Sequence, residues 1–153
     1  MKITQEADYA LRMMCLLAKR TAAGEQIVGA ATLAEGVAVP TRFGLKILHR
    51  LAQAGLVRTS RGATGGYSLV PDPADITVRQ VIEAIDGPTR LNRCLSDTYA
   101  CQNNPNKDCC RLHHVFEELS GMLAERLDRL TVATVIDSSV ELADILRMVR
   151  EPN

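Results

Sequence analysis

Apolar residues recur every three or four positions through the first fifty residues, the spacing that buries one side of an α-helix. The pattern predicts a first helix that begins after a Thr4 cap, a short second helix at about 30–36, and a third at about 42–54. Two short β-prone runs at 56–60 and 67–70 then flank a glycine-rich turn, which is typical of a β-hairpin.

This order of elements is that of a winged helix-turn-helix, a DNA-binding architecture. Its second helix, the recognition helix, enters the major groove, and its hairpin, the wing, reaches the DNA backbone or the minor groove. The predicted fold class is therefore mainly α with a small β-hairpin wing. The DNA-binding domain is expected to cover residues 1–88, with a further short helix after Thr77 completing it.

Charge is spread unevenly along a chain whose net charge is zero. Between Gly36 and Pro71 there are five basic residues and no acidic one, the local footprint of a polyanion such as DNA. A solvated helix face would account for the same charges, but the surrounding winged-helix pattern favours DNA. Two wing glycines would also let the backbone approach phosphate. The candidate DNA-binding residues are Arg42, Lys46, His49, Arg50, Arg58, Arg61, Gly65 and Gly66.

A leucine-rich stripe in the last third of the chain predicts one long amphipathic helix from Arg111 to about Leu130. A stripe of this length exceeds what a small winged-helix core needs to cover. It therefore indicates a dimer seam, with an internal core helix as the alternative. A last helix is expected at about 139–150, packed back on the body. Residues 111–153 are accordingly assigned to a dimerisation helix and a C-terminal helix.

Residues 89–110 form the remaining unit, a cysteine-rich loop. Four of the five cysteines and two of the three histidines lie between Cys94 and His114. Soft ligands at this density in a polar loop indicate a metal centre. With no leader and no apolar run long enough for a membrane span, the chain is expected in the cytoplasm and away from membranes. Clustered cysteines in that compartment are more often ligands or redox switches than structural disulfides.

Several motifs belong together. Asp8-Tyr9-Ala10-Leu11 lies in the first helix, Ala54-Gly55-Leu56-Val57 precedes the wing, and Arg61-Gly62-x-x-Gly65-Gly66-Tyr67 lies within it. Three spaced cysteines stand ahead of the long helix. With these features the sequence resembles the BadM/Rrf-type bacterial transcription regulators, the family of the IscR-like and NsrR-like iron–sulfur sensors, over nearly its whole length.

The resemblance implies a homodimer that binds a two-fold operator in double-stranded DNA and an iron–sulfur cluster, 4Fe–4S or 2Fe–2S. Carried over, the cysteine ligands are Cys94, Cys101 and Cys110, because the family's third cysteine directly precedes the long helix. Two matches remain for the fourth ligand. His113 fits the IscR-like 2Fe–2S arrangement, and Asp8, from the opposite subunit, fits the NsrR-like 4Fe–4S arrangement. Asp8 could instead pair with Arg12 one turn on.

The expected function is a transcription regulator, a repressor or dual regulator, whose DNA affinity is gated by a cluster that senses redox, nitric oxide or iron–sulfur status. The alternative is a cluster-free thiol-switch or zinc-bound regulator, in which Cys109 and Cys110 take part. The sequence departs from the family in its longer cysteine spacings, the additional Cys109, and Gly44, where a larger residue is usual. No oxyanion-hole motif, nucleotide loop or acid/base pair indicates an enzyme or a small-molecule substrate.

Overall fold

The computed structural model is mainly helical with one two-stranded antiparallel hairpin, which confirms the predicted fold class. It describes residues 2–62, 64–103 and 106–151. The pair 104–105 of the predicted cysteine-rich loop and the last two residues, 152–153, therefore lie outside the described residues.

Helix α1 (Gln5–Ala22) is the central element of the core, and α2, α3, α4 and α6 all pack against it. The helix begins where the sequence predicts, because the Thr4 hydroxyl accepts a hydrogen bond from the Ala7 N–H at 3.2 Å. One side of α1 is buried at the spacing of a helical stripe. Its buried residues are Ala7, Ala10, Met13, Met14, Leu17 and Ala18.

Helices α2 (Ala30–Gly36) and α3 (Thr41–Gln53) form the helix-turn-helix. A Cβ added at Gly44 of α3 would lie 2.9 Å from the Ala34 Cβ of α2, closer than side chains normally approach. Gly44 therefore allows the two helices to pack against each other, which gives a physical reason for the glycine at this position. In the turn between them, Ala38 has a φ of 56°, in the left-handed region that glycine usually occupies.

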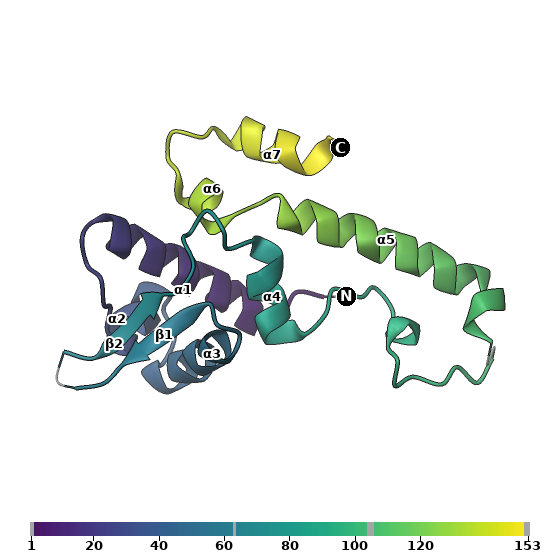
Figure 1. Ribbon diagram of the computed structural model, residues 1–153, viewed down its shortest axis with the longest axis horizontal. Helices are drawn as coiled ribbons and strands as arrows, with labels where there is room; N and C mark the ends of the chain where they lie inside the picture. Colours follow the sequence, from purple (N-terminus) through teal and green to yellow (C-terminus); the bar gives the residue numbers. More distant parts are fainter. Residues whose placement is uncertain (1, 63, 104–105, 152–153) are drawn as a thin grey trace.

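Strands β1 (Val57–Ser60) and β2 (Gly66–Leu69) form the wing, with Val57 opposite Leu69 and Ser60 opposite Gly66. The wing is fastened to the segment before α2 by two backbone hydrogen bonds between Val28 and Tyr67, each 2.9 Å long. The core therefore holds the base of the wing, while its turn extends away from the helices (Figure 1).

Helix α4 (Val78–Asp86) starts with a capping box between Thr77 and Gln80, and it packs on α1, α3 and α5. The chain then passes through the cysteine-rich loop into the long helix α5 (Arg111–Asp128), which extends well beyond the winged-helix body (Figure 1). No helix among the described residues combines the length and apolar content that crossing a membrane requires.

The C-terminal part differs from the sequence prediction. A short helix, α6 (Val132–Ile136), begins after the Thr131 cap and places Val132 in the core beside α1, because Thr77 and Thr131 pair as an isolated bridge. The last helix, α7 (Leu142–Arg150), was expected to pack on the body. Instead it lies alongside α5 (Figure 1), and none of its residues is buried.

Candidate metal centre and DNA-binding surface

The loop that carries the cysteines is fastened at its start by hydrogen bonds to both flanking helices. The Thr89 N–H donates to the Glu83 carboxylate of α4 at 2.8 Å, and the Leu91 N–H donates to the Ser120 hydroxyl of α5 at 3.1 Å. The Asn92 side chain then caps a 3₁₀ turn, Arg93–Leu95, by accepting from the Cys94 N–H. These contacts fix the position at which Cys94 leaves α4.

Cys94, Cys101 and Cys110 line one cavity of about 380 Å³ between the loop and the first turn of α5. All three thiols are half-buried and belong to no disulfide. Leu112 and Phe116 supply apolar walls, so the thiols face a partly water-excluded space. The structure thus brings the three predicted cysteine ligands together, although sixteen residues separate the first from the last.

His113 lines the same cavity. Its Nδ1 is buried and has no hydrogen-bond partner among the described residues, which leaves a nitrogen free to bind a metal. The neighbouring His114 is engaged elsewhere, with its Nε2 2.9 Å from the Asp108 carbonyl oxygen. Cys109 is exposed, accepts a hydrogen bond from the Asn106 side chain at 3.3 Å, and does not line this cavity.

Three thiols and one imidazole are a donor set suited to an iron–sulfur cluster or to zinc. Among the described residues, no three His, Cys, Asp or Glu side chains lie close enough to hold a single metal ion. The donors instead line the wall of a shared cavity. Arg93 and Tyr99 complete that wall, the guanidinium lying 4.8 Å from the ring centroid in a cation–π contact.

Asp8 lies elsewhere in the subunit. It is on α1 and forms an ion pair with Arg12 at 2.7 Å, the contact that the sequence offered as the alternative to metal binding. Hydrogen bonding and charge from this carboxylate raise the pKa of Arg12. Asp8 borders a different hollow, together with Tyr9 and the helix-turn-helix turn at Val37 and Ala38. One subunit therefore does not bring Asp8 to its own cysteines.

The exposed face of α3 carries Arg42, Lys46 and His49, and the wing carries the exposed Arg58 and Arg61. All five were expected from the sequence to reach DNA. The structure adds a residue that sequence reasoning missed, because Leu45 lies on the same face of α3 and is 43% exposed. An apolar side chain at three-residue spacing from Arg42, on a helix that reads DNA, could have identified it.

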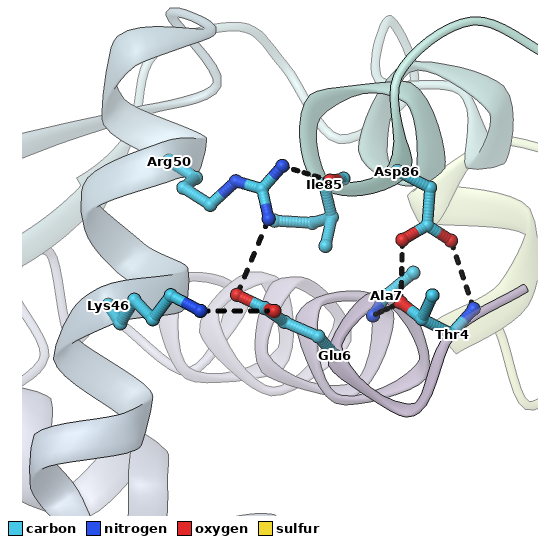
Figure 2. Close-up of polar contacts among 7 residues, drawn as sticks. All are labelled: Thr4, Glu6, Ala7, Lys46, Arg50, Ile85 and Asp86. Carbon is cyan, nitrogen blue, oxygen red and sulfur yellow. Dashed lines mark hydrogen bonds and ion pairs between the residues drawn. The ribbon is translucent and has the colours of Figure 1, made fainter.

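Three other expected DNA contacts have internal roles. Arg50 is half-buried, and its guanidinium contacts the Glu6 carboxylate and the Ile85 carbonyl oxygen (Figure 2). A side chain at Gly66 would collide with the Val28 carbonyl, and one at Gly65 with the Ser60 carbonyl. Both wing glycines are thus required by close backbone approach within the subunit.

A winged helix with a basic face on its second helix and on its wing defines the class of winged-helix DNA-binding proteins. The sequence profile of Rrf2, described as an iron-dependent transcriptional regulator, matches residues 3–138. The chain belongs to the Rrf2 family of transcriptional regulators.

Two relatives illustrate the similarity. An rrf2-like HTH-type transcriptional regulator of Rhodobacter capsulatus is 31% identical over 147 residues, covering 94% of this chain and 98% of the relative. The HTH-type transcriptional regulator NsrR of Bacillus subtilis is 28% identical over 149 residues, covering 97% and 99%. These relatives are regulators and not enzymes, in agreement with the sequence expectation.

Solved structures share the fold. IscR of T. potens superposes with a TM-score of 0.66 at 26% identity, covering 92% of this chain and 89% of that one. CymR of B. subtilis, titled the global cysteine regulator, superposes with a TM-score of 0.70 at 26% identity, covering 92% and 99%. The family therefore includes proteins similar to this chain that are named for different signals.

Proposed function

We propose that this Rrf2-family regulator acts as a homodimer on a two-fold operator, and that an iron–sulfur cluster held by Cys94, Cys101 and Cys110 gates its DNA affinity. The observation that carries the proposal is the shared cavity, in which the three cysteines meet a histidine with an unpartnered buried nitrogen. Buried nitrogen atoms without a partner are rare in native proteins, and a metal ligand is one explanation for them.

His113 is the proposed fourth ligand within the subunit. A nitrogen ligand is exchanged more readily than a thiolate, which suits a site that must respond to its surroundings. Asp8 is the second candidate. It would have to come from the partner subunit, and its ion pair with Arg12 would have to break or rearrange. The two candidates differ in an observable way, because only the second needs the dimer to complete the site.

The described residues connect this site to the DNA-binding face. When bound, a cluster supplies a reactive centre that oxidants or nitric oxide can attack. The Cys94 loop follows α4 directly, and α4 packs on the recognition helix α3. On its other side, Cys110 is the residue that precedes α5, the proposed dimer helix. A change in the loop therefore acts on both elements that determine the spacing of two recognition helices.

A thiol switch is the second candidate function, and Cys109 favours it. This thiol is exposed beside Cys110 and belongs to no disulfide, so it is accessible to oxidants. A zinc-bound regulator with the Cys94, Cys101, Cys110 and His113 donors belongs to the same alternative. Both predict a protein that binds DNA without iron or sulfide.

Anaerobic purification followed by absorbance spectroscopy and iron, sulfide and zinc analysis tests the proposal. Wild type is expected to show visible charge-transfer absorption and both iron and sulfide. Cys110→Ser should lose them, whereas the matched variant Cys109→Ser should keep them, because only Cys110 lines the cavity. His113→Ala should change the spectrum and Asp8→Ala should leave it unchanged if the fourth ligand comes from the same subunit.

A colourless wild-type protein that lacks iron and sulfide yet binds DNA tightly would contradict the cluster and support the alternative. A spectrum altered by Asp8→Ala but not by His113→Ala would transfer the fourth ligand to the partner subunit. Equal losses in Cys109→Ser and Cys110→Ser would remove the argument from the cavity.

A further inference from the structure

Arg50 lies near the end of the recognition helix, but its guanidinium does not lie in the open. One nitrogen, Nη1, is 3.4 Å from the Glu6 Oε1 of α1, and the other, Nη2, donates to the Ile85 carbonyl oxygen at the end of α4. Figure 2 shows the guanidinium between these two acceptors, with Lys46 reaching the same carboxylate from one turn earlier. Three helices are thus joined at one side chain.

We propose that Arg50 is a positioning residue that sets the orientation of the recognition helix through Glu6 and Ile85, and that it does not contact DNA. The proposal rests on α3 being the helix that reads DNA, as proposed above, and on nothing about the cluster. A planar guanidinium suits this role, because it can donate to two acceptors at once in fixed directions.

The environment of Glu6 supports this assignment. Its side chain is only 19% exposed, so its negative charge needs compensation inside the subunit. Arg50, at 35% exposure, is the more enclosed of its two cationic partners, whereas Lys46 is 63% exposed and can reach solvent. Moving Arg50 to a DNA phosphate would leave Glu6 with one exposed partner and Ile85 with an unpaired carbonyl.

A second contact fixes the other side of this junction. Asp86 accepts hydrogen bonds from the Thr4 backbone N–H at 2.9 Å and from the Thr4 hydroxyl at 2.6 Å (Figure 2). The start of α1 and the end of α4 are thereby joined independently of Arg50. Arg50 connects α3 to a preformed pair of helix ends, so its loss should misalign α3 without separating α1 from α4.

DNA binding by folded variants tests the proposal, using a duplex selected from random DNA by the wild-type protein and an unrelated duplex of the same length. Arg50→Ala should weaken binding to the selected duplex about tenfold and leave binding to the unrelated duplex nearly unchanged. The slope of log affinity against log salt for the unrelated duplex should also be unchanged, because no phosphate contact is lost. Simple destabilisation of a protein that remains folded would not alter this ratio.

Arg61→Ala is the matched control, since Arg61 is an exposed arginine on the wing. Its removal should weaken both duplexes and reduce the salt slope by about 0.9, the effect of one lost phosphate contact. Glu6→Gln should reproduce the loss of discrimination seen in Arg50→Ala. Arg50→Lys should do so as well, because one ammonium cannot reach both acceptors in the same geometry.

If Arg50→Ala reduces the salt slope as Arg61→Ala does, or if Arg50→Lys matches wild type, Arg50 is a phosphate contact and the proposal fails. Tighter operator binding by Glu6→Gln would also overturn it, because that result means that Glu6 competes with DNA for Arg50. If wild type selects no sequence and Arg61→Ala changes nothing, the DNA-binding assignment itself fails. Should Arg50→Ala not fold, the Lys and Gln variants carry the measurement.

Discussion

At the scale of single residues, Gly44 shows how packing can reverse an expectation from helix propensity. Glycine in a helix interior costs about 1 kcal/mol relative to alanine, so alanine would be favoured at this position on propensity alone. Gly44 is buried, however, and a methyl group there would lie 2.9 Å from the Ala34 Cβ and 3.0 Å from the Met13 Cε. The recognition helix is positioned by close contact with α2 as well as by Arg50.

Gly44→Ala is therefore expected to lower the free energy of unfolding by about 1–3 kcal/mol, the usual cost of overpacking a core. Urea denaturation followed by circular dichroism would measure it. Gly121→Ala in α5 is the matched control, because a Cβ there meets nothing within 4 Å in the subunit. It should raise the free energy of unfolding by up to about 1 kcal/mol. Stabilisation by both changes would contradict the close helix contact.

At the scale of elements, Glu83 controls how α4 continues into the cysteine-rich loop. Its carboxylate accepts from the Thr89 N–H at 2.8 Å and from Arg79 at 3.0 Å. Arg79 also reaches Asp128 at the end of α5, at 2.8 Å. Partial burial opposes ionisation of Glu83, but the hydrogen bonds from Thr89 and Arg79 outweigh it and lower the pKa of this carboxyl. One charge thus joins both helices that flank the loop.

Because its pKa is lowered in the folded state, Glu83 stabilises the fold above its unfolded pKa, and this contribution is lost as pH falls through the folded pKa. Glu83→Gln should therefore reduce the free energy of unfolding by about 1–2 kcal/mol at neutral pH. The difference from wild type should shrink as the solution is acidified below the ordinary range for a glutamate. Thermal or urea unfolding at several pH values would measure this difference.

Glu35→Gln, at an exposed position on α2, is the control and should leave the free energy of unfolding unchanged. A Glu83→Gln difference that stayed constant from neutral to strongly acidic pH would show that the hydrogen bonds do not depend on the ionised carboxylate.

At the scale of the whole molecule, the leucine-rich stripe of α5 separates into two neighbouring faces. Phe116, Leu123 and Leu127 are half-buried against the subunit itself. The other members are exposed to between 44% and 65% and lie at the spacing of one apolar seam: Leu112, Val115, Leu119 and Met122. An apolar seam of this kind on a long, projecting helix supports the proposed homodimer, in which a second copy would cover it.

Leu119→Glu places a charge in the middle of the proposed seam and should convert the dimer to a monomer. Operator affinity should fall on the order of 100-fold, because the two half-sites would no longer be bound together. Light scattering coupled to size-exclusion chromatography measures the first effect, and a binding titration measures the second. Glu118→Lys changes the charge more, but it lies on another face of α5 and should remain dimeric. A wild-type protein that is monomeric at micromolar concentration would contradict the seam.

Much of this arrangement could be predicted from the sequence because it depends on local spacing. The Thr4 and Thr77 caps, the stripe of α1 and the glycine-rich turn each act within a few residues of themselves. The three cysteine positions could be named as ligands, but their meeting in one cavity depends on how α5 returns beside the end of α4. The short helix α6 was missed because its five residues carry too little periodic pattern to be recognised.

By itself, then, the sequence determined the winged-helix order, the basic character of its recognition face and the choice of Cys94, Cys101 and Cys110, because periodicity, charge and motif are local properties. Only the tertiary structure decided what Arg50 contacts. From the helical period it belongs to the outward face of α3, but its partners Glu6 and Ile85 come from helices 44 and 35 residues away. Contacts at such separations arise from packing, and no pattern along the chain records them.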